Sequence, residues 1–473
     1  MGKRYWGCAL AGLQSFVYDV PQEDAAKRLR ARSATLIFVP ALVAHRVRLV
    51  DPQADLLYLG GGKVLVGVSQ DLTELEGELR SWSRELAQLS GGSLGLYWAE
   101  GDTPAALLAA LAEAKWRSGR QADGSWFGHL GAPALVPSHR RLGHPDWEAD
   151  FGREVGKRLG AAGIRTGGEW RIVGEERVEL VDDAGAAEID FGEGREGGGI
   201  SVSLPRYVPM KNADEVLSFN EIAEQAQESG KGIAYLAVLK LDGDQIGKTL
   251  RARLDEGLDA YKDASARLSR FFGTTVPQIL ESQFPHIYLV YSGGDDLVAV
   301  GHYRDILDTA LLIHREYGEG TVSSGISFFG RKSPVLHAVE KADGYLERSK
   351  DRGRNRVTVG GQTMTWPHLE RALALSDQIA AACEAGHLPS SMVQLLRQLG
   401  GWFLDTSAVA ASVAPCKAAV FLSYFYGRRN VRSDELTAEV QAYFNELQES
   451  EEPWRLAGLV GTLASWKMRE VKV

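Results

Sequence analysis

The chain has 473 residues, of which 44% are hydrophobic and 24% charged, and this length predicts about three domains rather than one core. Its formal net charge of −9 excludes a surface coated everywhere with nucleic acid, but it is compatible with a local basic groove. Three scattered cysteines exclude a disulfide framework, and the lack of a long apolar run or secretion signal predicts a cytoplasmic protein.

Two windows of the sequence share one order of elements. The first runs from a strand at 6–10 through the hairpin LLYLGGGKVLVGV and the strand LGLYW to a helix ending in AEAKWRSGR. The second runs from YLAVLKLDGD through HIYLVYSGGDDLVAVG and SSGISFF to a helix ending in LERSKDRGRN. This repeat predicts two related palm domains, 1–130 and 206–360, each a ferredoxin-like split βαβ sheet with helices on one face.

The segments outside the two palms differ from them in pattern. Residues 131–205 contain the glycine-rich acidic run DFGEGREGGGI and predict a small β-rich insert. From 361 to 473 the pattern turns helical, with Pro367, Pro389 and Ser433 where helices would begin. The predicted fold class is therefore α+β, with two palm domains, a β-rich insert and a C-terminal helical bundle.

Carboxylates follow two predicted strands of the second palm. Asp242 and Asp244 end a strand that is apolar on both faces, and Asp295-Asp296 follow a Gly-Gly pair typical of a tight hairpin. The hairpin alone is more typical of an ordinary turn with solvated aspartates than of a metal site. If the strand lies beside the hairpin, the carboxylates meet at one sheet edge and repel unless magnesium or manganese lies among them. The predicted metal ligands are Asp242, Asp244, Asp295 and Asp296, and the predicted catalytic residues are Asp242, Asp295 and Asp296.

Phosphate-binding groups are predicted around these carboxylates. A helix expected to start near Gln245 would present backbone N–H groups, and Lys350 and Arg354 would present two cations at a helix end. The alternative for the cations is that they complement the helix dipole. The predicted nucleotide-binding set is Gly243, Gln245, Ile246, Gly247, Ser292, Gly293, Gly294, Lys350 and Arg354.

The first palm lacks this chemistry. Its hairpin reads GGGK, with Lys63 and no acidic residue, and no aspartate ends its first strand. It is therefore predicted not to hold a catalytic metal. It either binds a nucleotide through Gly60–Gly62 or only packs against the second palm.

Taken together, these stretches resemble the large polymerase-cyclase subunit of type III CRISPR effector complexes. The resemblance rests on AGLQSF, LYLGGGK, RYVP, YLAVLKLDGDQIG, YSGGDDLVAVG and SPVLHAVEKADGYLERSK, which occur in family order. It implies that ATP is joined into cyclic oligoadenylate when the complex holds target RNA, with Mg²⁺ or Mn²⁺ on Asp242 and Asp295, Asp296 assisting, and phosphates on Lys350 and Arg354. It also implies partners: a crRNA-handle-binding subunit and a small helical subunit.

Two departures from the family pattern limit the expected activities. The chain has no adjacent His-Asp pair and its first palm begins close to Met1, so a form without the N-terminal nuclease domain is expected. The 131–205 insert contains no cysteine, unlike the zinc modules of many relatives. Besides the cyclase, two readings stay open: a catalytically silent scaffold of the RNA-guided complex and a stand-alone cyclic nucleotide synthase.

Overall fold

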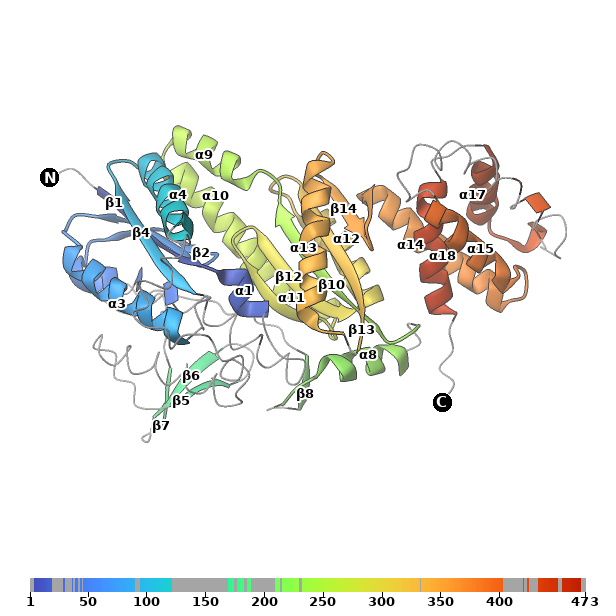
Figure 1. Ribbon diagram of the computed structural model, residues 1–473, viewed down its shortest axis with the longest axis horizontal. Coiled ribbons are helices and arrows are strands. Elements are labelled where there is room, and N and C mark those ends of the chain that lie inside the picture. The colour runs from blue at the N-terminus through green and yellow to red at the C-terminus, as the bar shows by residue number, and fades with distance from the viewer. Residues whose placement is uncertain are drawn as a thin grey trace.

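The structure is a computed structural model. It describes residues 4–18, 46–89, 94–120, 169–173, 177–182, 185–188, 209–212, 215–228, 232–331, 333–402, 433–449 and 453–468, with single positions between 29 and 44 and between 420 and 424. The described elements form an elongated body with the N-terminal sheet at one end and the C-terminal helices at the other (Figure 1). Over these ranges, every helix is too short or too polar to cross a lipid bilayer.

The first palm is a four-stranded antiparallel sheet with strand order β2-β3-β1-β4. Its elements are β1 (Arg4–Ala11), α1 (Leu13–Tyr18), β2 (Asp55–Gly60), β3 (Lys63–Val68), α3 (Thr73–Leu89), β4 (Gly95–Gly101) and α4 (Pro104–Arg120). The prediction that all helices lie on one face is wrong. Helix α3 packs on the face of Trp6 and Cys8, while α4 packs on the opposite face, against Leu65, because the central strands bury apolar side chains on both faces.

The second palm repeats this topology and extends it. Its sheet has the order β11-β12-β10-β13-β14-β15, so β11-β12-β10-β13 corresponds to β2-β3-β1-β4. The strands are β10 (Tyr235–Gly243), β11 (Tyr288–Gly293), β12 (Asp296–His302), β13 (Val322–Gly330), β14 (Arg356–Val359) and β15 (Gln362–Thr365). The helices are α9 (Ile246–Glu256), α10 (Leu258–Arg270), the π-helical turn η1 (Phe271–Thr275), α11 (Val276–Gln283), α12 (Tyr303–Glu316) and α13 (Val335–Asp351).

Short elements connect the palms. A three-stranded antiparallel sheet within the predicted insert comprises β5 (Glu169–Val173), β6 (Arg177–Asp182) and β7 (Gly185–Glu188). The remainder of the predicted 131–205 insert lies outside the described residues. The small pair β8 (Met210–Asn212) and β9 (Glu215–Val216), followed by α8 (Phe219–Glu228), leads into the second palm.

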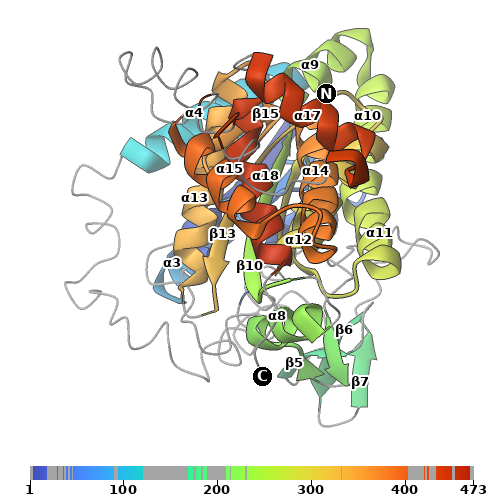
Figure 2. The ribbon, with the colours of Figure 1, turned by 90° about the vertical axis from the view of Figure 1, so that its right-hand side faces the viewer.

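The C-terminal helices begin later than predicted. Strand β15 pairs with β14 across a turn in which Gly360 and Gly361 have φ of 58° and 94°, so the palm sheet continues past the predicted boundary at 361. The helices are α14 (Trp366–Glu384), α15 (Ser390–Trp402), the short η2 (Ser433–Glu435), α17 (Ala438–Glu449) and α18 (Trp454–Lys467). Figure 2 shows this group stacked over one end of the second palm.

Two large cores hold these parts together. One contains apolar side chains from one face of the second sheet and from α14, α15, α17 and α18, so the helices continue the palm core. The other joins the first palm to the opposite face of the second sheet, and includes Trp6, Val64, Val238 and Val300. Because each fully buried large apolar side chain contributes about 1.5–3 kcal/mol, the shared core fixes the two palms against each other.

Candidate active site

Antiparallel pairing brings together the carboxylates of two separate stretches. Strand β10 lies beside β12, with Asp242 directly opposite Asp296. The Gly243 N–H donates a hydrogen bond of 2.9 Å to the carbonyl of Asp295, which fixes the turn to the strand end. As a result, one carboxylate oxygen each from Asp242, Asp295 and Asp296 lies within 4.8 Å of the others. The predicted convergence at the rim of the second sheet is present in the structure.

The carboxylate cluster, defined as Asp242, Asp295 and Asp296, lies in an environment that disfavours negative charge. Burial, followed by the charge of Asp242, raises the pKa of Asp295 above its ordinary 3.8. Burial, followed by a hydrogen bond with Asp242, also raises the pKa of Asp296 above its ordinary 3.8. Carboxylates that repel one another in a shielded place gain most from a bound cation.

Three lysines surround this cluster. The Lys350 ammonium lies 2.8 Å from an Asp242 oxygen, at the C-terminal end of α13. Lys240, a buried residue of β10, pairs with Asp343 of α13 and lowers the pKa of Asp296 by its charge. Lys63 comes from the first palm, and its charge lowers the pKa of Asp295. The positive charges around the cluster therefore come from both palms.

The fourth predicted ligand, Asp244, does not join the cluster. Its side chain is 8% exposed, and its two oxygens accept hydrogen bonds from Thr321 Oγ1 at 2.8 Å, Ser323 Oγ at 2.7 Å and the Asn355 N–H at 2.9 Å. The motif D-x-D placed it near the metal site by spacing alone. Its neighbours on β13 and after α13 occupy its oxygens instead.

Arg354 is placed differently from the prediction that paired it with Lys350 on one helix face. Helix α13 ends at Asp351, and Arg354 follows in a turn with φ of 60°. The glycine at 353 ends the helix with φ of 114°, a conformation that a helix cannot continue. The side chain is exposed, and its direction is set by this turn rather than by a helix.

The chain between β10 and α9 contains the loop that the sequence predicts to bind phosphate. Gln245 adopts the left-handed conformation with φ of 59° and precedes the first residue of α9, Ile246. The Lys248 N–H already donates to the carbonyl of Gln245 at 2.8 Å, so in the first turn the N–H groups of Ile246 and Gly247 are the ones that could bind an anion. A side chain at Gly247 would meet nothing within 4 Å, so there is open space beside this helix start.

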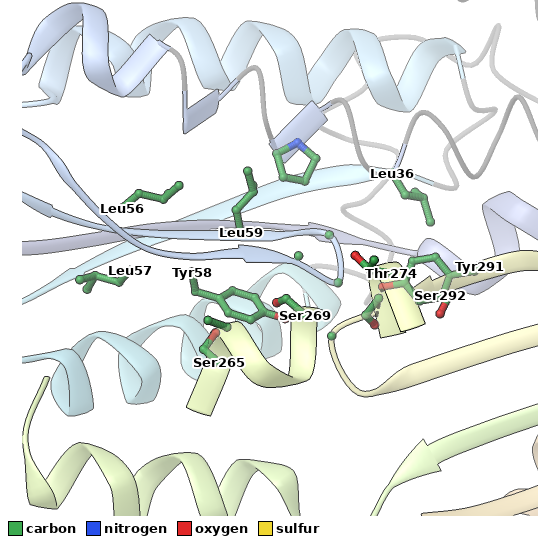
Figure 3. A pocket seen from close by; sticks show the side chains of 18 of the residues that line it. Leu36, Leu56, Leu57, Tyr58, Leu59, Ser265, Ser269, Thr274, Tyr291 and Ser292 are labelled. Atoms are coloured by element: carbon green, nitrogen blue, oxygen red, sulfur yellow. Dashed lines mark hydrogen bonds between the residues drawn. The ribbon is translucent and has the colours of Figure 1, made fainter. Parts of the chain in front are cut away.

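A cavity of about 430 Å³ separates the two palms next to the hairpin. Ser292, Gly293 and Gly294 line it from the second palm, and residues 56–62 line it from the first. Figure 3 shows Tyr58 beside Ser265 and Ser269, and Tyr291 and Ser292 beside Thr274. The cavity has aromatic and hydroxyl groups on its walls, which are features of a small-molecule site, and its lining residue Gly294 directly precedes Asp295 of the carboxylate cluster.

Sequence reasoning did not identify three residues of this site. Tyr58 and Lys63 belong to the other palm and lie within an apparently inert hairpin, so only the packing of the palms reveals them. Tyr317 packs against Gly243: a Cβ added at Gly243 would lie 3.1 Å from the hydroxyl oxygen of Tyr317. Its pKa is raised by burial and then by the charge of Asp295. A tyrosine after a helix carries no motif that would single it out.

Comparisons with known proteins agree with this arrangement. The family description "Cas10/Cmr2, second palm domain" matches residues 235–358, and "Csm1 subunit domain B" matches residues 6–104. The curated Cas10/Csm1 protein of Streptococcus thermophilus, named a single-strand-specific deoxyribonuclease of subtype III-A, is 22% identical over 76% of this chain and 53% of its own length. Its counterpart in Enterococcus italicus is 30% identical over 30% of this chain and 20% of its own length.

Solved structures share the fold over nearly the whole chain. The apo Csm1–Csm4 cassette superposes with a TM-score of 0.69 at 18% identity, covering 99% of this chain and 70% of that chain. The same cassette in complex with AMPPNP gives a TM-score of 0.67, and in complex with cA4 0.64. This chain spans about half the length of the Streptococcus relative and a fifth of the Enterococcus one. The chain thus contains one region that matches the Cas10/Cmr2 second palm domain and another that matches Csm1 domain B, and it shares the fold of the solved Csm1–Csm4 cassette.

Proposed function

We propose that this chain is a metal-dependent nucleotidyltransferase that converts ATP into cyclic oligoadenylate as the large subunit of a type III CRISPR complex. The observation that carries the proposal is the convergence of Asp242, Asp295 and Asp296 beside a cavity between two palms. A cluster of like charge at a buried strand end is costly for a protein that only binds partners. Solved Csm1–Csm4 relatives with AMPPNP and cA4 support the choice of adenine nucleotides.

The carboxylate cluster fits a hard divalent cation such as Mg²⁺ or Mn²⁺. It supplies only oxygen ligands, and no described histidine or cysteine joins the group. The Lys350 ammonium against Asp242 supports the proposal, because it indicates that the charge of this carboxylate attracts a cation. A bound metal would neutralise a triphosphate and lower the pKa of an attacking hydroxyl.

The residues around the cluster have distinct proposed tasks. Lys350 and the N–H groups at the start of α9 bind phosphate oxygens, and Arg354 contributes a cation from the adjacent turn. Lys63 adds positive charge from the first palm, next to Asp295. Ser292, Gly293 and Gly294 line the cavity that would hold part of a nucleotide. Substrate is thereby bound between the palms, with its triphosphate directed to the second one.

The partners are proposed by analogy with the relatives. The solved neighbours contain Csm1 bound to Csm4 within a type III-A interference complex. We expect this chain to dock onto a crRNA-handle-binding subunit of that kind and, through its C-terminal helices, onto a small helical subunit. Target RNA held by such a complex would then switch on synthesis.

The test incubates the purified chain with ATP or GTP and Mg²⁺ or Mn²⁺, alone and with effector partners and target RNA, and identifies products by mass spectrometry. Cyclic oligoadenylate from ATP is expected, and Asp295→Ala should abolish it. The exposed Asp255→Ala variant on α9 is the matched control and should keep the activity. Undiminished synthesis by the Asp295 variant would contradict the site assignment.

The same assay separates the alternatives. Product formation by the chain alone would support a stand-alone synthase. Tight binding of partners without product under any condition would support a silent scaffold and overturn the proposed activity.

A further inference from the structure

Asp244 lies within a hydrogen-bond network that the proposed chemistry does not use. Its oxygens accept from two hydroxyl groups, those of Thr321 and Ser323, and from the backbone N–H of Asn355. Its own N–H donates to the carbonyl of Thr321 at 2.8 Å. A buried carboxylate satisfied in this way is a structural junction between β10, β13 and the segment after α13.

The segment that Asp244 holds is strained. Gly353, Arg354 and Asn355 have successive φ values of 114°, 60° and 48°. Glycine and asparagine tolerate this region, but arginine adopts it only where the surroundings enforce it. The Arg354 N–H donates to the carbonyl of Ser349 at 3.1 Å, which ties the turn back to the helix.

Asn355 is held on its other side as well. Its side chain forms a hydrogen bond with His314 of α12. The His314 ring stacks on Trp366, with ring centroids 4.5 Å apart and an interplanar angle of 18°. Asn355 is thus held between Asp244 and His314, and His314 in turn packs on Trp366, the first residue of the C-terminal helices.

Strand β10 and the residue after its end contact α13 and the turn that follows α13. Lys240 pairs with Asp343, Asp242 with Lys350, and Asp244 with Asn355. Lys240 and Asp242 are two residues apart in β10 and therefore point to one face of the strand, whereas Asp244 lies in the turn that follows β10. Asp242 therefore contacts the C-terminal end of α13 through the side chain of Lys350, and Asp244 contacts the turn after α13 through the backbone N–H of Asn355.

We propose that Asp244 is a positioning residue that fixes the 353–355 turn and, through it, the C-terminal end of α13, so that Lys350 stays against the carboxylate cluster. This inference replaces the metal-ligand role predicted for Asp244. Its effect on catalysis rests on the proposed function, but its effect on the turn does not.

Two substitutions distinguish a positioning residue from a metal ligand. The hydroxyl groups of Thr321 and Ser323 can donate or accept, so Asp244→Asn keeps an acceptor for the Asn355 N–H and turns one hydroxyl bond around. Asp244→Ala removes every contact. A metal ligand would lose its function in both variants, because binding of the cation depends on the negative charge.

The experiment measures three quantities on the full chain: amide hydrogen exchange of a peptide covering 350–356, binding of Mn²⁺ alone by calorimetry, and product formation. For Asp244→Ala we expect at least about tenfold faster exchange, Mn²⁺ affinity within roughly threefold of wild type, and a rate lower by about 10-fold to 100-fold. Asp244→Asn should stay near wild type in exchange and within about tenfold in rate.

Asp51 offers a matched control in the first palm. It is 1% exposed and accepts hydrogen bonds from Ser69, Gln70 and Gln53, so Asp51→Ala also removes a buried carboxylate network. That variant should leave exchange at 350–356 unchanged. If Asp244→Ala does not fold, Thr321→Val removes one of the three donors and should still accelerate exchange in the same peptide.

Two results would overturn the inference. Unchanged exchange at 350–356 in Asp244→Ala and in Thr321→Val would show that Asp244 does not hold the turn. Loss of Mn²⁺ binding in Asp244→Asn to the extent seen in Asp242→Asn would show that it is a ligand. If the wild type forms no product, the proposed function fails, whereas exchange and Mn²⁺ binding still decide this inference.

Discussion

The hairpins of the two palms have the same backbone pattern and opposite chemistry. Each has a register shift two residues before its turn, between Leu56 and Tyr58 in the first palm and between Leu289 and Tyr291 in the second. Each turn is then closed by one pair of residues, Gly60 with Lys63 and Gly293 with Asp296. Lys63 therefore occupies the position of Asp296.

The pairing with the central strand extends this correspondence. Asp242 lies opposite Asp296 in the second palm, and Ala9 lies opposite Lys63 in the first. Gly62 then corresponds to Asp295. All three members of the carboxylate cluster have been replaced in the first palm by residues that cannot bind a metal. The palm fold therefore forms without the carboxylate cluster, and the proposed chemistry depends on three side chains at one rim.

The strongest test of this comparison transfers a first-palm residue to the second palm. Asp296→Lys should lower product formation by on the order of 10³-fold or more, because it replaces a carboxylate of the cluster with a cation. Steady-state rates with saturating Mn²⁺ measure the loss. Circular dichroism should show an unchanged fold, since Lys63 occupies the equivalent position without disturbing its sheet. Activity close to wild type would show that the two hairpins are not distinguished by this residue.

A second test asks whether the first palm contributes to catalysis through Lys63. Lys63→Ala should lower the rate by roughly 10-fold to 100-fold if the ammonium contacts a phosphate, the range expected for a charge-assisted hydrogen bond. Arg80→Ala, at an exposed position of α3, is the control and should have no effect. An unchanged rate would reduce the first palm to a packing partner.

The close approach of the hairpins gives a third prediction. Gly294 has φ of 68°, and a Cβ there would lie 3.0 Å from the Tyr58 hydroxyl oxygen. Gly294→Ala should therefore lower the free energy of unfolding by about 1–2 kcal/mol, measured by urea denaturation. Adding Tyr58→Phe to this variant should restore the part of the unfolding free energy that the steric contact removes. The part lost to backbone strain at position 294 should remain lost.

Gly344→Ala on α13 is the matched control for that substitution. No atom lies within 4 Å of its Cβ, so this variant should be slightly more stable than wild type because alanine is the better helix former. If Gly294→Ala and Gly344→Ala lower the free energy of unfolding equally, the close contact between the hairpins is not the cause of the loss.

The smallest expected effect concerns pH and metal. Since burial raises the pKa of Asp296 above 3.8 in the folded protein, the folded state binds this proton more tightly than the unfolded chain. Stability then falls as the pH rises above about 4 toward the raised pKa. In EDTA at neutral pH, Asp296→Asn should therefore melt at a higher temperature than wild type.

Calorimetric scans with EDTA and with Mg²⁺ check this prediction. The difference should shrink or reverse with Mg²⁺, because the metal stabilises the ionised wild-type cluster. A lower melting temperature of Asp296→Asn in EDTA would contradict the proposed repulsion among the carboxylates.

Periodicity and turn chemistry were enough to predict the fold class and the carboxylates that meet. The alternation of apolar strands and helices predicted two palms, and the Gly-Gly turn after an apolar strand placed Asp295 and Asp296 at a hairpin. Such signals are local, because hydrogen bonding and side-chain alternation over a few residues determine strands and turns. Asp242 could be joined to them from sequence because adjacent strands of one sheet end at a common rim.

Only the tertiary structure determined which side chains share that rim and which do not. Asp242 and Asp244 are two aspartates at the same strand end, yet the oxygens of Asp244 accept hydrogen bonds from Thr321 and Ser323, at the start of a strand far along the chain. Lys63 and Tyr58 reach the site from the other palm, through a core that joins two domains. These contacts depend on packing between distant segments, and distances of that kind are not encoded in any short window of residues.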